Sequence, residues 1–349
     1  MLGIRSRAHG VTRLLLAGTA IAAATGLMLA GCASTSTPAA TKHATSATGE
    51  PDLTGKTINI ALGAAPATSD TKIALMVSIL QQWGADAKIV NQVGDPAAVR
   101  VVLSGDAQVG AIAGPSAINS GLIAIGPSQP RLDYHFIGAP SLKKVTQLPG
   151  KIYGTSNQHG VEALAFAALL KAKHIDASKV TQTIAGGASV RVSAMIAGHI
   201  QATFVHAQDV KTLTDQGFND LATMSKVAPD VADSFIATTP AWYKANPDLA
   251  QAIDQAWIEA ARIFNDDKAK WISAALAYAG GSKADAEDLY TALKSSDTFP
   301  VSSSAYSEAS AQEQEQQAAD VGAISNSPDI ATWFDQGAWD AAVKAEKIK

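Results

Sequence analysis

The sequence has a single cysteine among its 349 residues, and this residue, Cys32, follows directly after an apolar stretch near the N-terminus. One thiol cannot form a disulfide within the chain, and it cannot supply a cysteine cluster for zinc or iron. The folded part must therefore be stabilised by an ordinary apolar core.

Positive charge is also scarce, with 27 Lys and Arg against 31 Asp and Glu. Three of the arginines, Arg5, Arg7 and Arg13, lie in residues 1–31, which contain no acid, so removal of this segment moves the net charge from −4 to −7. Nucleic acids select basic surfaces, and we expect no nucleic-acid partner.

Long apolar runs are absent after residue 30. The one such run, residues 14–30, follows the arginines and ends in Leu29-Ala30-Gly31-Cys32, which resembles the bacterial lipobox. This arrangement predicts a lipoprotein signal peptide over 1–31 and lipidation of Cys32, the alternative being an uncleaved transmembrane helix. Residues 32–53 have the composition of a flexible tether, so we expect the protein to be lipid-anchored on the outer face of the cytoplasmic membrane.

Catalytic signatures are missing as well. The sequence contains no Gly-x-Ser-x-Gly, no phosphate loop and no His-x-x-x-His, and its seven histidines are scattered. Ser141 and Lys144 match the Ser-x-x-Lys of penicillin-recognising enzymes only formally, because the partner motifs are absent. We expect no metal, no cofactor and no enzymatic activity.

What the sequence does contain is an alternation of short apolar runs with amphipathic segments, which is typical of βα units. The first block predicts strands at 56–62, 87–91 and 107–113, with helices at 71–83 and 95–105; Asp95 and Pro96 have the residue types of an N-cap and first helical position. The second block predicts strands at 151–155, 180–185 and 202–206, with helices at 161–173 and 189–197. Helices follow at 247–264, 267–279 and 283–294, where Trp257 and Trp271 are expected in the core, and a fully solvated helix at 308–317.

About 300 residues favour two lobes over one core. We assign residues 54–140 plus 235–349 to lobe one and 141–234 to lobe two.

An internal echo supports two similarly built lobes. Residues 103–112 and 196–205 share the order apolar, small, Gly, two variable residues, Gln and then an apolar strand, with Gly105 and Gln108 matching Gly198 and Gln201. Each segment predicts a helix that ends at a glycine and turns directly into a strand.

The order of several further segments resembles the substrate-binding proteins of ABC transporters in the nitrate/sulfonate/taurine and pyrimidine-precursor class. Residues 145–156 are similar to its "d-L-k-G-k-x-v-a-v-x-x-g-s" segment, 174–180 to its "g-l-d-x-x-x-v" step, 191–202 to its "r-x-x-A-l-x-x-G-q-v-D-a" step and 247–252 to the helix after its hinge return. The resemblance covers roughly residues 55–280. This chain has Gln108 and Gln201 where the class commonly has Asp, and Pro149 where a charged residue is usual.

The resemblance implies an α/β fold of the periplasmic-binding-protein type II kind, two βα lobes with a cleft and a helical C-terminal extension. It also implies a monomer that passes a small ligand to an ABC permease and its ATPase. Two alternatives stay open, a binder of a pyrimidine precursor or aromatic carboxylate, and a ligand-sensing partner of a membrane receptor.

The ligand is expected where strands lead into helices, because free N–H groups and the helix dipole there favour an anion such as a sulfonate or nitrate. Five junctions qualify, at 64–70, 114–116, 155–160, 186–189 and 205–207, and none contains Trp, Phe or Tyr. The candidate ligand-binding residues are Thr68, Ser69, Gly114, Ser116, Ser156, Asn157, His159, Gly187, Ser189 and His206.

These residue types also have simpler roles. Ser69, Ser116, Ser156 and Ser189 could merely cap helices, and His159 and His206 could be structural. Arg191 could pair with an anion across the cleft, although we favour a role in stabilising its own lobe.

Overall fold

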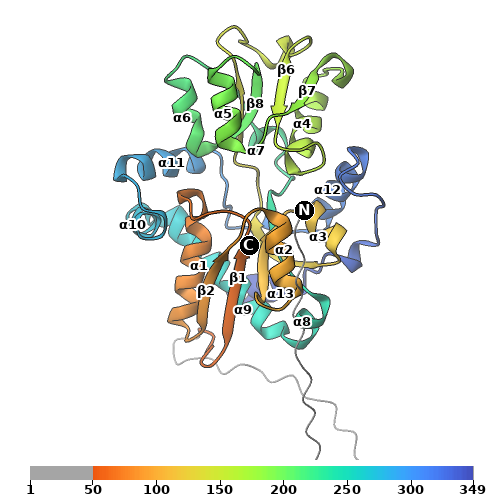
Figure 1. Cartoon of the computed structure of the whole chain (residues 1–349). Coiled ribbons are helices and arrows are strands. Elements are labelled where there is room, and N and C mark those ends of the chain that lie inside the picture. The colour runs from red at the N-terminus through yellow and green to blue at the C-terminus, as the bar shows by residue number, and fades with distance from the viewer. Residues whose placement is uncertain (1–49, 349) are drawn as a thin grey trace, which may run out of the picture. The chain divides into compact units, whose positions relative to one another are not determined.

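The computed structural model describes residues 50–348, all within one unit that spans 42–349 (Figure 1). The signal segment, Cys32 and residues 32–49 of the expected tether lie outside the described residues. The fold begins slightly before residue 54, since Leu53 is fully buried and its N–H donates to the carbonyl of Trp83 at 2.7 Å.

A first five-stranded sheet has the order β2-β1-β3-β10-β4. Strand β1 runs parallel to β2 and β3, whereas β10 is antiparallel to β3 and β4. The strands are β1 Thr57–Leu62, β2 Asp86–Asn91, β3 Val109–Ile112, β4 Ile123–Gln129 and β10 Ser234–Thr238. We call the part of the molecule built on this sheet lobe one.

A second sheet repeats this arrangement in the order β7-β6-β8-β5-β9. Strand β6 is parallel to β7 and β8, and β5 is antiparallel to β8 and β9. The strands are β5 Tyr134–Gly138, β6 Ile152–Thr155, β7 Thr181–Ile184, β8 Ala202–His206 and β9 Asn219–Thr223. The part built on this sheet is lobe two, which is drawn mainly in green in Figure 1.

The helices follow the strands in the expected rhythm. They are α1 Thr71–Gln82, α2 Asp95–Leu103, α3 Gly114–Ser120, α4 Val161–Ala172, α5 Ala188–Ile196, α6 Ala207–Thr214, α7 Met224–Val227, α8 Pro240–Ala245, α9 Pro247–Asp266, α10 Lys268–Ala279, α11 Lys283–Ser295, α12 Glu308–Asp320 and α13 Gly337–Ala345. Short 3-10 turns lie at Thr68–Asp70, Val145–Gln147, Ala177–Lys179, Ser303–Ala305 and Ile330–Thr332.

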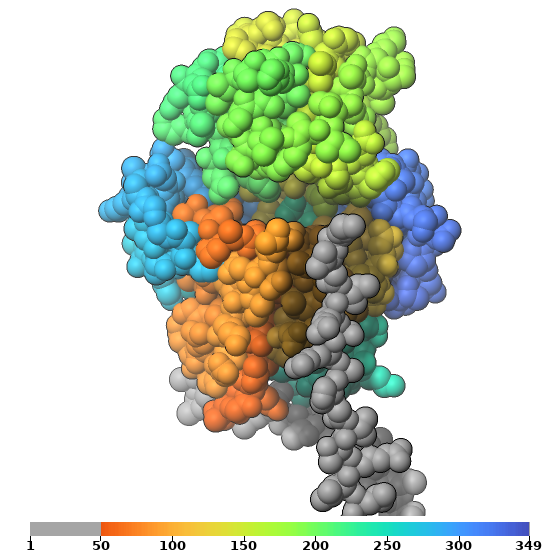
Figure 2. Space-filling model, viewed as in Figure 1, coloured from red at the N-terminus to blue at the C-terminus, as the bar shows by residue number. Residues whose placement is uncertain are grey.

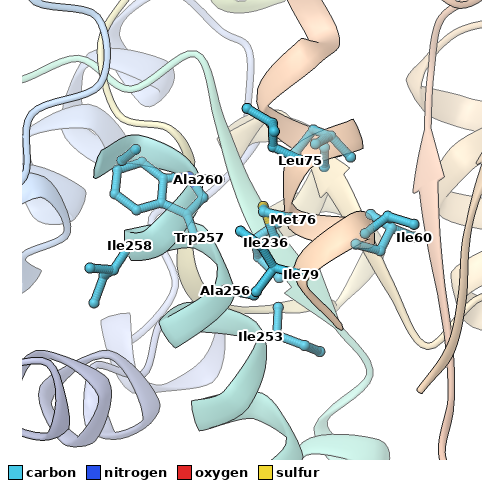
Figure 3. Close-up of a cluster of buried hydrophobic side chains, with 14 of the residues drawn as sticks. Ile60, Leu75, Met76, Ile79, Ile236, Ile253, Ala256, Trp257, Ile258 and Ala260 are labelled. Atoms are coloured by element: carbon cyan, nitrogen blue, oxygen red, sulfur yellow. The ribbon is translucent and has the colours of Figure 1, made fainter. Parts of the chain in front are cut away.

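Both faces of each sheet are covered by apolar side chains, because successive residues of a strand point to opposite faces. In lobe one, Ile60 belongs to the cluster with α1 and α9, whereas Ala61 belongs to the cluster with α2 and α3. Figure 3 shows the first cluster, in which Met76 and Ile79 of α1 lie near Ile236. Trp257 and Trp271 are buried as expected.

The internal echo corresponds to a shared structural device. Gly105 and Gly198 both have the left-handed φ that stops a helix, at 83° and 76°. After each glycine a glutamine side chain reaches the first strand of its own lobe: Gln108 Oε1 accepts from Asn59 N at 2.7 Å, and Gln201 Oε1 accepts from Ile152 N at 3.1 Å. The two lobes therefore share this hydrogen bond from a glutamine side chain to the first strand, which the repeated sequence pattern alone did not predict.

The chain passes between the lobes twice, once between β4 and β5 and once between β9 and β10. The expected boundary at residue 140 is wrong in one respect, because β5 pairs with β8 and so belongs to lobe two. The first crossover therefore spans residues 130–133, and the second lies near 228–233.

The C-terminal extension contacts both lobes, whereas we assigned it to lobe one. Helix α11 packs against α6, and α12 packs against α3 and α4. The expectation that α12 is solvated all round was also wrong, because Ala311, Gln314, Glu315 and Ala318 are buried. Ala318 joins Leu164 of α4 in an apolar cluster, which attaches the extension to lobe two.

Candidate functional site

A cavity of about 760 Å³ lies between the lobes. All five strand-to-helix junctions singled out in the sequence contribute residues to its wall. The surface is recessed where lobe two meets the orange part of lobe one (Figure 2). The geometry therefore brings together segments that are up to about 140 residues apart in the chain.

Most of the candidate residues line this cavity. They are Ser69, Ser116, Ser156, Asn157, His159, Gly187 and His206. Thr68, Gly114 and Ser189 do not line it. Gly114 instead packs against the side chains of Gln314 and Phe235, where an added Cβ would lie 3.1 Å from each. Contact of the seven lining residues with a ligand remains a prediction.

The helix starts at the cavity have no side-chain caps. Helices α1 to α6 all begin at the cavity wall, and none of their N-cap residues accepts a hydrogen bond from its own helix. The four serines are thus not N-caps. Asp95 is not an N-cap either: Gly94 takes that position, and the Asp95 carboxylate accepts from Ala113 N at 3.2 Å, before α3.

Acidic residues distinguish these helix starts from one another. The first turns of α2, α4 and α6 carry Asp95, Glu162 and Asp209, whose negative charge offsets the helix dipole. The first turn of α5 has no acid, and its N-cap Gly187 has open space where a Cβ would lie. Helix α1 also has no acid in its first turn, but its N-cap residue is Asp70, so α5 is the one helix of eight or more residues that begins at the cavity with no acid at its start.

Arg191 on α5 is committed to its own lobe. Arg191 is 2 % exposed, and its guanidinium forms an ion pair with Glu162 and donates to Thr203 Oγ1 at 3.1 Å and to the carbonyl of Gly186 at 2.7 Å. Glu162 Oε2 in turn accepts from Ser156 N at 2.8 Å and Ser156 Oγ at 2.7 Å. This network agrees with a stabilising role for Arg191, and it orients the loop before α4.

The hinge side of the cavity is rich in carboxylates that the sequence interpretation missed. Asp133 ends the first crossover and Asp233 ends the second, each directly before the strand that enters a lobe. Asp70 lies on the same wall, and its Oδ2 is buried without a hydrogen-bond partner. Burial is the largest cause that raises the pKa of Asp70, to about 6. Burial, together with the negative charge of Asp133, raises the pKa of Asp233 to about 7.

Two cations lie among these carboxylates. His206 Nδ1 is 2.8 Å from Asp133 Oδ1, and although burial opposes the charged imidazolium, the carboxylate raises the pKa of His206 to about 9. Lys72 is 3 % exposed, donates to the carbonyl of Ser128, and has its Nζ 4.3 Å from the centre of the Phe299 ring. Burial lowers the pKa of Lys72 to about 7.

One aromatic ring does reach the cavity wall, from outside the five junctions. Tyr134 begins β5 and is 8 % exposed; its ring centre lies 4.8 Å from that of His206 and 5.9 Å from that of Phe204. Burial, together with the negative charge of Asp233, raises the pKa of its hydroxyl well above the usual value. The ring is thus packed within lobe two, with little surface left for stacking on a ligand.

A weak sequence signal for the hinge carboxylates existed. Asp133 and Asp233 each stand alone between an apolar or small residue and a strand, and Lys72 is the one charge in the apolar segment 71–80. Single charges in such positions point to a site only once the topology shows that both crossovers meet at one wall.

Neither a metal cluster nor a membrane span is found in the part of the chain that the structure describes. Among residues 50–348, no three or more His, Cys, Asp or Glu side chains are grouped to hold a metal ion. In the same range, no helix combines the length and apolar character needed to cross a bilayer.

Two α/β lobes with the same strand order, two crossovers and a cavity between them are the fold of type II periplasmic binding proteins. Residues 79–267 match the family described as NMT1/THI5 like, and because this is more than half of the chain, the protein belongs to the NMT1/THI5-like family. Among curated proteins, none matches the sequence.

Solved structures share the fold at low sequence identity. A putative periplasmic sulfonate-binding protein SsuA of an ABC transporter from Methylobacillus flagellatus KT is 17 % identical, with a TM-score of 0.66 over 85 % of this chain and 96 % of that one. The alkanesulfonate-binding SsuA from Xanthomonas axonopodis pv. citri, bound to MOPS, is 16 % identical, with a TM-score of 0.61 over 82 % and 99 %. The periplasmic nitrate-binding protein NrtA from Synechocystis PCC 6803 is 12 % identical, with a TM-score of 0.67 over 85 % and 90 %.

Proposed function

We propose that this protein is an extracytoplasmic solute-binding protein of an ABC importer, which captures a small organic or inorganic anion of the sulfonate, taurine or nitrate type and has no enzymatic activity. The observation that carries the proposal is the convergence of five strand-to-helix junctions, from both lobes, on one cavity with uncapped helix starts. Such a site binds polar groups through backbone N–H donors.

The proposed mechanism is capture by closure of the lobes. Two crossovers, at residues 130–133 and 228–233, connect the lobes, and hinge motion about them would open and close the cavity. The closed form would dock on the permease, and its ATPase would power release of the ligand into the membrane channel. The lobe assignment that we propose is 54–129 plus 234–349 and 130–233.

The anionic group of the ligand would bind at the start of α5. Gly187 and Ala188 line the cavity, and the first N–H groups of a helix have no partner within it. Asn157 and His159 lie on the same lobe at the cavity wall and can add donors. Gly187 permits close approach because no neighbouring atom lies within 4 Å of a Cβ placed there.

The names of the solved relatives support this reading. Two of them are described as sulfonate-binding and one as nitrate-binding, and each covers most of this chain. The proposed partners are therefore a small-molecule ligand, an ABC permease and an ATPase, and we propose that the protein acts as a monomer.

The buried position of Tyr134 favours a compact ligand over a ring held by stacking. A pyrimidine precursor or an aromatic carboxylate remains the alternative ligand. A ligand-sensing partner of a membrane receptor remains the alternative role.

Isothermal titration calorimetry of the purified protein tests the proposal. The panel consists of alkanesulfonates, aminoalkanesulfonates, nitrate, a hydroxymethylpyrimidine and benzoate. We expect one of the sulfonates to bind at micromolar concentration or tighter, with saturation at one molecule per chain. Absence of binding by every member of the panel would contradict the proposed function.

The lipid anchor is a separate part of the proposal. We propose that residues 1–31 are removed and that Cys32 carries the lipid, which would hold the folded part at the outer face of the membrane. Expression of the wild type and Cys32→Ser in a bacterial host, followed by fractionation, tests this. Wild type is expected in the membrane fraction and Cys32→Ser outside it, and an equal distribution would reject the anchor.

A further inference from the structure

The C-terminal extension reaches lobe two at two separate places. Helix α11 packs against α6, and α12 packs against both α3 of lobe one and α4 of lobe two. In Figure 1, α11 and α12 lie on opposite sides of the molecule, at the level where the two lobes meet. The lobes are therefore joined by packed helices as well as by the two crossovers.

Helix α12 connects the lobes through its buried face. Ala311 belongs to the core cluster of lobe one, and Gln314, almost one turn later, donates to the carbonyl of Ala232 in the second crossover. Ala318, a further turn along, lies in the apolar cluster with Leu164 of lobe two. Residues three and four apart share one face of a helix. One face of α12 thus contacts lobe one, the hinge and lobe two in succession.

Leu164 is buried by the extension and not by the core of its own lobe. Other residues of α4, such as Leu169, pack in the core cluster of lobe two. Leu164 is equally buried, yet it belongs to a separate cluster with Ala318 and Ile324 of the extension. Rotation of lobe two away from α12 would expose Leu164 and Ile324 to water, which is unfavourable for apolar surface.

The segment that follows α12 is fixed to lobe one. Gly322 turns the chain with a left-handed φ of 69°, and Asn119 Nδ2 of α3 donates to the carbonyl of Ala323 at 2.9 Å. Ile118 of α3 packs against the same apolar cluster that contains Leu164. This cluster therefore joins α3 to α4, two helices that begin at the cavity wall in different lobes.

The contact between α11 and α6 involves a smaller side chain of lobe two. Helix α6 contributes Ala207, which is 5 % exposed, to the large cluster that also contains Leu289 of α11. An alanine side chain buries less apolar surface than a leucine side chain does. Leu164 is therefore the larger apolar anchor between the extension and lobe two.

We propose that residues 308–324, which comprise α12 and the segment after it, form a latch that holds lobe two in the arrangement of this structure. The cavity opens when Leu164 separates from this latch. The inference goes beyond the proposed function, because it concerns the balance between two lobe arrangements whatever the ligand is. A latch of this kind keeps the cavity closed around a captured molecule and slows its escape.

The distance between spin labels on the two lobes tests the latch without any ligand. Cys32 is the only cysteine of the chain, so the full-length Cys32→Ser protein can be labelled at two introduced cysteines, Arg100→Cys and Ser193→Cys. Both positions are exposed, and they lie on α2 and α5, which begin at the cavity wall in different lobes. Pulsed electron paramagnetic resonance then gives the distribution of distances between the lobes.

Three variants of this labelled protein are compared with it. Leu164→Ala weakens the latch from lobe two, and Ile324→Ala weakens it from the extension. Leu169→Ala is the matched control, because it removes the same atoms from the same helix at the same burial, but from the core of lobe two. Urea unfolding of each variant records the loss of stability, which we expect for all three.

We expect Leu164→Ala and Ile324→Ala to shift the distribution to longer distances, whereas Leu169→Ala should leave it unchanged. Identical distributions in the parent and both latch variants would overturn the inference, and so would an equal shift in Leu169→Ala. If Leu164→Ala does not fold, the comparison of Ile324→Ala with Leu169→Ala decides. Because no ligand is added, either result leaves the proposed function to be judged by calorimetry.

Discussion

The side-chain amide of Gln314 forms two hydrogen bonds with the backbone of Ala232. Its Oε1 accepts from Ala232 N at 3.1 Å and its Nε2 donates to the Ala232 carbonyl at 2.9 Å. Ala232 is a residue of the second crossover, one position before Asp233. A helix of the C-terminal extension thus holds the hinge backbone next to the cavity.

Replacing Gln314 by alanine should destabilise the protein by about 1–3 kcal/mol, because both polar groups of Ala232 would lose their partners in a buried place. Gln312→Ala on the exposed face of α12 is the control and should change stability by less than about 0.5 kcal/mol. Urea unfolding of the two variants measures the difference. Equal effects would show that the crossover does not depend on this amide.

Arg191→Met should cost about 3–5 kcal/mol, because it leaves the buried Glu162 carboxylate without its charge partner. The double variant Arg191→Met with Glu162→Gln should recover part of the loss. A double-mutant cycle by chemical denaturation gives the coupling energy. Additive effects of the two substitutions would contradict a direct coupling.

Asp254 on α9 should make the protein less stable as the pH rises. It is fully buried, neither carboxyl oxygen has a hydrogen-bond partner, and burial raises its pKa well above 3.8. A raised folded-state pKa means that stability is lost as pH increases above the unfolded value. Compared with Asp254→Asn, the wild type should lose up to about 1.4 kcal/mol per pH unit above about pH 4. Urea unfolding of both proteins at pH 5 and pH 7 checks this, and a difference that does not change with pH would reject it.

His206 should stay protonated through neutral pH. Its raised pKa of about 9 means that the ion pair with Asp133 contributes fully below about pH 6.5, the usual value for the ring, and is lost as the pH rises through about 9. Two-dimensional NMR of the imidazole should give a midpoint above 8, about two units above the usual value. A midpoint near the usual value would mean that the pair is not formed in solution.

The glutamines of the internal echo should be structural rather than ligand-binding. Gln108→Ala and Gln201→Ala should each cost about 0.5–1.5 kcal/mol, because each removes a hydrogen bond to the first strand of its lobe. Ligand affinity should remain within about twofold of the wild type, since neither side chain lines the cavity. Thermal unfolding and calorimetry on the same samples separate the two effects.

The sequence predicted the parallel βα part of the fold well. The strands and helices that the sequence predicted between Thr57 and His206 fall within a few residues of their expected bounds, because apolar periodicity and helix-stopping glycines such as Gly105 act locally. Strands β4, β5, β9 and β10 were not assigned. In each sheet one of them, β10 or β5, runs antiparallel to both of its neighbours, and β4 or β9 lies beyond it at the edge, so their place depends on pairing between segments far apart in the chain.

The sequence predicted which segments line the cavity, but it did not predict the charged residues on the hinge side of the cavity. Residues at helix starts, such as Ser116 and Gly187, could be found because open sheets bind ligands beyond the ends of their strands. Asp133 and Asp233 could not be found in the same way, because their proximity arises only when both crossovers meet. Gln314 was misjudged for a similar reason: composition made α12 look solvated, and only tertiary packing buries one face of it.

The place of β10 in the first sheet has a consequence for how the chain is made. Residues 234–238 lie between β3 and β4, yet they are synthesised after all five strands of lobe two. As the polypeptide emerges, β3 can pair with β1, but no strand connects β3 to β4 until β10 has been made, so the sheet of lobe one is completed only after all the strands of lobe two are present.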